Sequence, residues 1–343
     1  MFNVDTTADA PSDPADNSCS VASLAGACTL REAVTEARAG SGDEIVLGPG
    51  RHQLNSELDS LSQDMTIRGA GANSTTVIRQ PAIPGDQYRV FDVSSAKVVS
   101  ISGLTVTGGD VTGDGGGIRN SGNLTLNRVV VGGNNSSGGG GGVFTISGAT
   151  LEVTDSNVND NNAGRGAGIY AAGAVSLTRS LVDQNDASVE GGGLYQNPTI
   201  GTAPVSVLNS TVANNTSAAA GAAVMATTTG VQIDFSTIAY NDAGGSNGSI
   251  TPDNVVLNVF DSIVVSQKTR GRKVRSSCRK ATRNLRSKRS CTRLGARARS
   301  RAAAAAARTP SPSPGSSAVG RYGRAPTRRS SPPATPPATA RRP

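Results

Sequence analysis

One pattern recurs along residues 98–266 and constrains the fold more than any other feature of the chain. Each copy carries an aliphatic anchor residue, and successive anchors are 25, 27, 24, 30, 26 and 26 residues apart. The anchors are Val106, Val131, Val158, Val182, Val212, Ile238 and Val264. This period is too short for a strand–helix–strand unit, and it is typical of a solenoid in which each copy stacks on the next.

Two further apolar columns precede the anchors, with a polar residue between them in every copy. The column five residues before the anchor is Ile101, Leu126, Val153, Leu177, Val207, Ile233 and Val259. The column two residues earlier is Val99, Leu124, Leu151, Val175, Val205, Val231 and Leu257. Apolar, polar, apolar is the alternation of a strand with one buried face. Seven such copies in register, without a helical segment, predict an all-β fold, a parallel β-helix.

Two corner patterns agree with this fold. Three residues after the anchor the chain has Asn134, Asn161, Asn185, Asn215 and Asn241, with Gly109 and Gln267 at the two ends of the column. We expect these asparagines to adopt the left-handed backbone of a sharp corner, and their amides to bond from rung to rung. A second corner joins a small residue to an aliphatic one, at Gly117-Ile118, Gly142-Val143, Gly168-Ile169, Gly193-Leu194 and Ala223-Val224. Glycine there avoids a Cβ clash.

The start of the chain is polar and precedes a cysteine pair. Residues 1–18 contain no apolar run long enough for a signal peptide or a membrane helix, so we expect an export signal that was trimmed or a start that was assigned late. Cys19 and Cys28 bracket a short loop. A disulfide between them is expected and indicates an oxidising compartment, while a free pair or a metal pair is the alternative. We predict no metal site here.

A short helix is predicted directly after Cys28. Thr29 and Glu32 have the spacing of a capping box, in which the hydroxyl and the carboxylate both bind free amides at the helix start. Leu30, Ala33, Val34 and Ala37 then share one face, and Gly40 ends the helix. Residues 1–40 are therefore expected to form a segment whose helix covers the open first rung of the solenoid.

The segment Cys28-Thr29-Leu30-Arg31-Glu32-Ala33-Val34 resembles the Cys-Ser-Leu-Arg-Glu-Ala motif of a family of bacterial surface proteins. Thr29 departs from the usual serine of this motif but keeps the capping hydroxyl. In that family the motif precedes a right-handed parallel β-helix of the pectate-lyase-like type. The resemblance covers residues 1–266, including 44–47 and 65–71, which look like the family's first rungs. It implies a right-handed solenoid, export, and glycan-rich surroundings, but no particular reaction.

The repeats define the remaining boundaries. Residues 41–266 are expected to form the β-helix, in which 45–47, 65–67, 76–78 and 90–93 are less regular early rungs. Residues 267–343 are expected to be a disordered tail, because residues 268–343 hold 22 Lys and Arg, no Asp or Glu, and a Pro/Ser/Ala-rich composition. The preceding part is acidic, with 11 Lys and Arg against 25 acids. Such a tail fits electrostatic binding to nucleic acid or acidic polymer, a stalk through a cell wall, or out-of-frame translation. We favour the last because the change falls inside a rung, and a matching intact mass with an error-free gene would refute it.

The sequence offers only weak candidates for catalysis. The single histidine, His52, lies far from the regular columns and is expected at the surface. No stacked carboxylate pair is visible that would provide the acid and base of glycoside hydrolysis. A lyase needs a Ca²⁺ site and a basic residue, for which Asp110, Asp114 and Arg119 are candidates, although Asp in a Gly-rich loop is more often turn chemistry. No other cofactor is predicted.

The residue after each second-corner aliphatic gives the strongest functional signal. These residues are Arg119, Phe144, Tyr170, Tyr195 and Met225, and alternation places them outside the core. Three consecutive aromatics, in a chain with five Phe and five Tyr, form a ridge that can stack on sugar rings. Alternatively the ridge stabilises the sheet or lies under a loop.

We therefore predict an exported, extracellular or cell-surface β-helix protein that interacts with polysaccharide through Arg119, Phe144, Tyr170 and Tyr195. The alternatives are a polysaccharide lyase or glycoside hydrolase, and a structural or adhesive rod that binds protein. A monomer is expected, with no nucleic-acid partner for the folded part and no transmembrane segment.

Overall fold

The structure is a computed structural model that describes residues 1–11, 19, 24–38, 42–80, 84–197, 204–227, 230–245, 248–253 and 257–265. The chain divides into the units Met1–Cys278 and Arg279–Pro343, and the description below concerns the first. The basic tail, with Cys278 and Cys291 and the three origins considered for it, lies outside the described residues.

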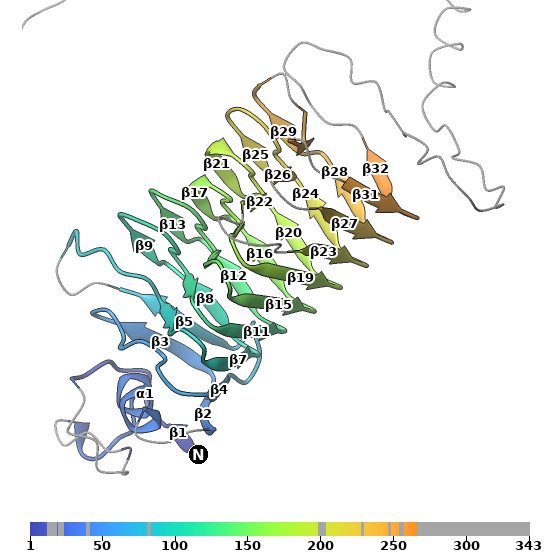
Figure 1. The fold of residues 1–343 in the computed structure, drawn as a ribbon. Helices are drawn as coiled ribbons and strands as arrows, with labels where there is room; N and C mark the ends of the chain where they lie inside the picture. The colour runs from blue at the N-terminus through green and yellow to red at the C-terminus, as the bar shows by residue number, and fades with distance from the viewer. Residues whose placement is uncertain are drawn as a thin grey trace, which may run out of the picture. The chain divides into compact units, whose positions relative to one another are not determined.

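The described strands form four parallel sheets, and neighbouring strands of a sheet come from successive rungs (Figure 1). The ten-stranded sheet contains β1 (Phe2–Val4), β2 (Asp43–Leu47), β4 (Met65–Arg68), β7 (Val98–Ser102), β11 (Asn123–Asn127), β15 (Thr150–Thr154), β19 (Ala174–Thr178), β23 (Val205–Leu208), β27 (Val231–Asp234) and β31 (Leu257–Phe260). The nine-stranded sheet contains β3 (Gly50–Leu54), β5 (Thr75–Arg79), β8 (Thr105–Thr107), β12 (Val130–Gly132), β16 (Asn157–Asn159), β20 (Leu181–Asp183), β24 (Thr211–Ala213), β28 (Thr237–Ala239) and β32 (Ile263–Val265).

The two remaining sheets have shorter strands. The seven-stranded sheet contains β6 (Phe91–Val93), β10 (Ile118–Asn120), β14 (Val143–Thr145), β18 (Ile169–Ala171), β22 (Leu194–Gln196), β26 (Val224–Ala226) and β30 (Ile250–Pro252). The six-stranded sheet contains β9 (Asp110–Val111), β13 (Asn135–Ser136), β17 (Asn162–Arg165), β21 (Asp186–Glu190), β25 (Thr216–Ser217) and β29 (Asp242–Ala243). The predicted fold class, a right-handed parallel β-helix, is confirmed, and the solenoid has about eight turns.

The predicted columns are the strand registers of the structure. Val131 pairs with Val106 on one side and with Val158 on the other, and the same ladder continues through the remaining anchors to Val264. The column that begins at Ile101 is also continuous, in the ten-stranded sheet. The anchors from Val106 to Ile238 are buried in one hydrophobic core. Apolar residues at equivalent positions of successive rungs therefore pair with one another and fix the register between neighbouring strands.

The asparagine column forms a buried ladder of side-chain amides. Each Nδ2 donates to the Oδ1 of the next rung at 2.9–3.0 Å, from Asn134 through Asn161, Asn185 and Asn215 to Asn241. The same Oδ1 atoms accept backbone N–H groups, beginning with Gly109 N–H on Asn134 at 3.0 Å. The predicted rung-to-rung bonding is confirmed.

The left-handed residue of this corner is one position earlier than predicted. Positive φ angles of 51–67° occur at Gly133, Asp160, Gln184, Asn214 and Tyr240. The ladder asparagines do not have positive φ, so the prediction of a left-handed asparagine was wrong. The preceding residue makes the bend, and the asparagine side chain is thereby turned into the core, where its amide satisfies buried backbone groups.

A second ladder was not predicted. The hydroxyls of Ser156, Ser180, Ser210, Ser236 and Ser262 each accept the backbone N–H of the preceding rung, at 3.0–3.2 Å. Every one of these serines directly follows a left-handed residue, such as Asp155 or Arg179. At the corner between the ten-stranded and nine-stranded sheets, a left-handed residue is therefore followed by a side chain that bonds to the neighbouring rung. The asparagine corner has the same arrangement, with a longer side chain.

The early rungs also contain strands that the sequence did not predict. The expected segments near 45–47, 65–67, 76–78 and 90–93 are β2, β4, β5 and β6. Two strands were missed, β3 and the N-terminal β1, which pairs in parallel with β2 through Phe2 and Ile45. β1 adds an edge strand to the ten-stranded sheet.

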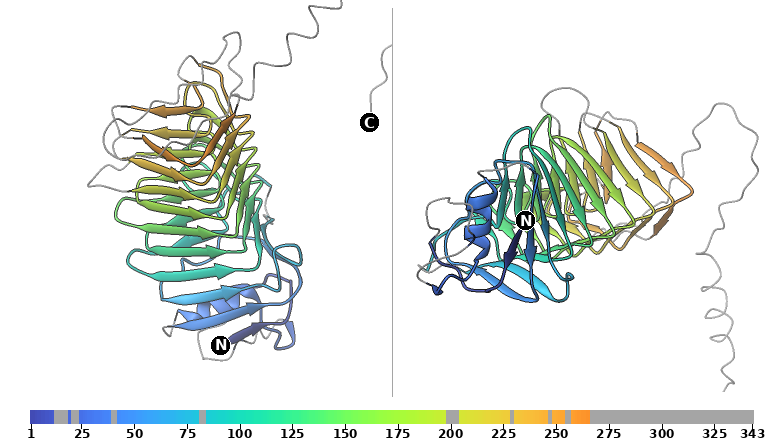
Figure 2. Two further views of the ribbon diagram at one scale, coloured as in Figure 1. Left: turned by 90° about the vertical axis from the view of Figure 1, so that its right-hand side faces the viewer. Right: turned by 90° about the horizontal axis from the view of Figure 1, so that it is seen from below.

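The predicted capping helix is α1 (Leu30–Ala37), and it lies at the N-terminal end of the solenoid (Figure 2). The Thr29 hydroxyl accepts the Glu32 N–H at 3.0 Å, which confirms the hydroxyl half of the capping box. The four predicted apolar positions, Leu30, Ala33, Val34 and Ala37, are buried in the same core as Ile45 and Leu47. The helix thus closes the apolar end of the first rungs, while Gly40 lies outside the described residues.

Arg31, within the motif segment, joins three parts of the N-terminal region. Its guanidinium donates to both carboxylate oxygens of Asp9, at 2.8 and 2.9 Å. It also donates to the backbone carbonyls of Ser56 and Glu57, at 3.0 and 2.8 Å. The Arg31 and Asp9 side chains are nearly buried, so this bidentate pair ties the first residues and a loop of the early rungs to the helix.

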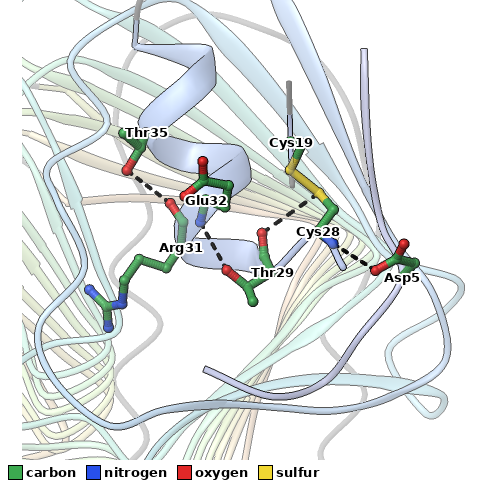
Figure 3. Close-up of a disulfide and its surroundings, with 7 residues drawn as sticks. All are labelled: Asp5, Cys19, Cys28, Thr29, Arg31, Glu32 and Thr35. Carbon is green, nitrogen blue, oxygen red and sulfur yellow. Dashed lines mark hydrogen bonds between the residues drawn. A yellow bond between two sulfur atoms is a disulfide. The ribbon is translucent and has the colours of Figure 1, made fainter. Parts of the chain in front are cut away.

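The expected disulfide joins Cys19 to Cys28, just before the helix (Figure 3). The Cys28 N–H donates to the Asp5 carboxylate at 2.8 Å, so the bridge also lies beside the segment that follows β1. It closes a loop with a sequence separation of 9 residues.

Loss of this bridge is expected to lower the free energy of unfolding by about 2–3 kcal/mol, as chain entropy predicts for a loop of this length. The measurement is urea unfolding with and without reductant, in a Cys278→Ser/Cys291→Ser background that leaves only this pair. The matched control adds Cys19→Ser and Cys28→Ser and should not respond to reductant. An unchanged midpoint on reducing the parent would contradict the prediction.

Candidate functional site

The candidate site lies on the outward face of the seven-stranded sheet. Strand pairing places one outward residue per rung in a single line, which we call the outer column. Its members are Asp92, Arg119, Phe144, Tyr170, Tyr195, Met225 and Thr251. The residues before them, such as Ile118 and Val143, point into the core and are fully buried. The predicted placement of this column outside the core is therefore correct.

The three aromatic rings of the outer column stack on one another. The ring centroids of Phe144 and Tyr170 are 4.8 Å apart, and the planes are tilted by 32°. Those of Tyr170 and Tyr195 are 5.1 Å apart, with a tilt of 37°. These centroid distances lie in the range of favourable aromatic pairs. The ridge is thus partly self-supporting, as the structural alternative proposed.

Within the outer column, exposure falls from Arg119 to Met225. The Arg119 side chain is 43% exposed, and Phe144 and Tyr170 are half-buried. Tyr195 is only 6% exposed and Met225 7%, because they pack with Ala220 and Tyr170 in a small cluster of their own. Arg119, Phe144 and Tyr170 are therefore accessible from solvent, whereas Tyr195 is covered and packs against Tyr170.

A second line of residues, the rim column, runs beside the outer column. It consists of Gly139, Arg165, Glu190 and Ala220, which are neighbours on successive rungs. The outer side chains lean over the rim of the preceding rung. A Cβ on Gly139 would lie 2.5 Å from Cδ2 of Tyr170, and the Arg165 guanidinium carbon lies 6.0 Å from the Tyr195 ring centroid. The absence of a side chain at Gly139 therefore makes room for the Tyr170 ring.

Two charged residues of the rim column, Arg165 and Glu190, lie near the Tyr195 side chain. Arg165 and Glu190 form an ion pair with a 3.4 Å separation. Burial raises the pKa of Tyr195, and the nearby Tyr170 and Glu190 raise it further, while Arg165 acts in the opposite direction. The Tyr170 hydroxyl receives a hydrogen bond from Asn197 Nδ2 at 3.3 Å.

The predicted catalytic candidates each have contacts within the scaffold. Asp110 pairs with Arg79 at 3.5 Å and accepts a hydrogen bond from Asn135 at 2.7 Å. The Asp114 carboxylate accepts the Gly139 N–H at 2.7 Å, and Arg119 lies 3.9 Å from the Asp92 carboxylate. Among the described residues, no group of three or more His, Cys, Asp and Glu side chains is placed to hold a metal ion. The lyase chemistry considered for Asp110, Asp114 and Arg119 stays a prediction.

The expectation that His52 lies at the surface was wrong. Its side chain is on the inward face of β3, in register with Val77, and the residue is 3% exposed. The Nε2 atom lies 3.1 Å from the Gly48 carbonyl oxygen. The missed signal is its position two residues before the buried Leu54, on the same face of the strand.

A hollow at the C-terminal end of the outer column was also missed. It has a volume of about 480 Å³ and is lined by Glu190, Met225, Ile250, Thr251, Pro252 and Asp253. Glu190 and Asp253 belong to different positions of the repeat, so a comparison of columns does not bring them together. Both line one hollow because three successive rungs stack, with the rung of β26 between those of Glu190 and Asp253.

Comparison with known proteins adds little to this geometry. No protein-family model and no curated protein matches the sequence. Among solved structures, the chain is similar to rice weevil pectin methyl esterase, with a TM-score of 0.39 and 12% identity, over 69% of this chain and 86% of that one. A likeness at this level supports no functional argument, and the fold assignment rests on the strand ladders. Within the described part of the chain, no helix has the length and apolarity needed to cross a membrane.

Proposed function

We propose that the chain is an exported β-helix protein that binds polysaccharide along the outer column, with Arg119, Phe144 and Tyr170 as the contact residues. The observation that most supports this proposal is the stacked, half-buried pair Phe144 and Tyr170 beside the exposed Arg119. Export is supported by the Cys19–Cys28 disulfide, which fits an oxidising compartment, and by the resemblance of residues 28–34 to a motif of bacterial surface proteins.

The geometry suits a linear ligand that runs along the solenoid axis. Consecutive outer-column residues are one strand spacing apart, about 4.8 Å, so they offer a repeating set of contacts in one line. The solvent-exposed parts of the stacked rings offer apolar surface to the C–H groups of sugar rings, and a guanidinium offers several hydrogen-bond donors to ring substituents. Tyr195 and Asn197 hold Tyr170 from the other side, which keeps its ring in a fixed position.

The proposal predicts that Tyr170→Ala weakens glycan binding. Loss of one stacking ring is expected to raise Kd about tenfold, roughly 1.4 kcal/mol. The measurement is titration calorimetry with the glycan that the wild-type protein binds most tightly on an array of acidic and neutral polysaccharides. Chain-length loss is followed in the same samples, with and without Ca²⁺, because cleavage would instead support the lyase or hydrolase alternative.

The matched control is Tyr240→Ala, because Tyr240 is 63% exposed and lies on a different corner of the solenoid. It should leave Kd unchanged. If both tyrosine variants bind as the wild type does, the outer column is not the binding face. If no glycan binds at all, a structural or adhesive rod becomes the better explanation.

A further inference from the structure

Another depression lies on the outward face of the six-stranded sheet, and we call it the side hollow. It has a volume of about 350 Å³, which is within the range of pockets that bind small molecules. Its lining includes Asn135, Ser137, Asn162, Gly164, Asp186 and Ser188, from β13 and the residue after it, β17 and β21. The same three rungs carry the aromatic rings, on β14, β18 and β22. The side hollow therefore lies beside the aromatic part of the outer column.

The rim column separates the side hollow from the aromatic rings. In each rung the chain passes first the hollow, then the rim residue and then the ring, as in Gly164, Arg165 and Tyr170. In the rung of β13 the rim residue is Gly139, two residues after Ser137, and the Tyr170 ring occupies the space that a side chain would fill there. A ligand unit that contacts Tyr170 is therefore one column of residues away from the side hollow.

The floor of the side hollow is formed by backbone. Each of its strands begins with an exposed residue, and a second outward position follows two residues later. At this second position the middle rung has Gly164, while the rungs on either side have Ser137 and Ser188. Gly164 has no side chain, so the two exposed serine hydroxyls extend further from the sheet than the residue between them. This difference produces a depression with polar groups around it.

The side chains around this floor are amides, hydroxyls and one carboxylate. Two of them are held by neighbouring rungs, because Asn135 Nδ2 donates to Asp110 at 2.7 Å and the Asp186 carboxylate accepts the Thr216 hydroxyl. The exposed Asn162 lies between Asn135 and Asp186 in the strand register. Amides and hydroxyls each provide both a donor and an acceptor. They therefore match the hydroxyl groups of a sugar, which also donate and accept.

We infer that the side hollow binds a hydroxyl-bearing sugar unit that branches from a polysaccharide chain on the outer column. This inference rests on the polysaccharide binding proposed above and adds that the ligand is branched. The main chain contacts Arg119, Phe144 and Tyr170. The branch crosses the rim column and bonds to the Asn162 amide and the Ser188 hydroxyl. These hydrogen bonds add affinity that an unbranched chain does not gain.

The test compares branched oligosaccharides with their own unbranched backbones, on the full chain, by titration calorimetry. One pair is galactosyl-mannopentaose and mannopentaose, and the other is xyloglucan heptasaccharide and cellotetraose. At least one branched probe is expected to bind about tenfold more tightly than its backbone. Asn162→Ala and Ser188→Ala should each weaken binding of that probe about fivefold and leave binding of its backbone unchanged. Tyr170→Ala should weaken binding of both.

Asn258→Ala is the matched control, because Asn258 is an exposed asparagine on the ten-stranded sheet. It should change neither affinity. Equal affinities of each branched probe and its backbone would overturn the inference, and so would unchanged binding of the branched probe in both Asn162→Ala and Ser188→Ala. If Tyr170→Ala still weakened binding, polysaccharide recognition by the outer column would stand. Binding of none of the four probes would also overturn the inference, and binding of no arrayed glycan would overturn the proposed function as well.

Discussion

Gly116→Ala is expected to destabilise the solenoid more than any other change considered for this chain. A Cβ on Gly116 would lie 2.2 Å from the Asn135 carbonyl oxygen and 2.7 Å from the Gly141 carbonyl oxygen. Both are backbone atoms of the next rung, so no side-chain rotation relieves the contact. Separation of the two rungs would break the ladder bonds on both sides of Gly116, and we expect a loss of about 4 kcal/mol or more.

Gly113→Ala is the matched control, because Gly113 lies three residues earlier in the same loop. A Cβ there has nothing within 4 Å, and the residue does not have positive φ. This variant should stay within about 0.5 kcal/mol of the wild type. The measurement is equilibrium urea unfolding followed by circular dichroism. Equal midpoints for the two variants would show that the rungs do not approach each other as closely as described.

The second large effect is expected for Asn161→Ala, in the middle of the asparagine ladder. Asn161 Oδ1 accepts both the backbone N–H and the side-chain amide of Asn134, at 3.1 and 3.0 Å. Its Nδ2 donates to the Val131 carbonyl at 3.0 Å and to Asn185 at 2.9 Å. Alanine leaves these fully buried groups without partners, and the expected loss is about 2–4 kcal/mol.

The neighbouring Asn162→Ala is the control, because Asn162 has the same side chain but is exposed. It should change the unfolding free energy by no more than about 0.5 kcal/mol. Hydrogen exchange adds a local measurement, because the Asn134 amide should lose protection in Asn161→Ala and keep it in Asn162→Ala. Retained protection in both variants would mean that the ladder does not hold this backbone group.

The fold could be predicted from the sequence because the same pattern of apolar and polar residues recurs in every regular rung. Val131 and Val158 occupy equivalent positions and pair in register, so a column seen in the sequence is also a ladder in space. The N-terminal region does not repeat, and β1 and β3 were missed there for that reason. His52 was misplaced because one histidine among irregular rungs gives no period from which its face can be read.

The candidate site was predictable only in part. Alternation correctly placed Phe144 and Tyr170 outside the core, but it carries no information on what covers a side chain from outside. The burial of Tyr195 depends on Ala220 and Met225, which come from the following rung. The hollow depends on Glu190 and Asp253, whose positions in the repeat differ. These contacts join residues at different positions of the repeat, in rungs of different length. An alignment of the repeats therefore does not predict them.

The inward columns and the corner ladders account for the pairing of the rungs without help from the outer column. Met225 and Thr251 occupy the same register position as Arg119 and Tyr170, although their side chains differ in charge, size and polarity. Substitution at one such position changes what a single rung presents and leaves the backbone frame intact. Single amino-acid replacements can therefore change the surface of one rung at a time. In such a fold, surface properties can evolve without loss of the contacts that stabilise the solenoid.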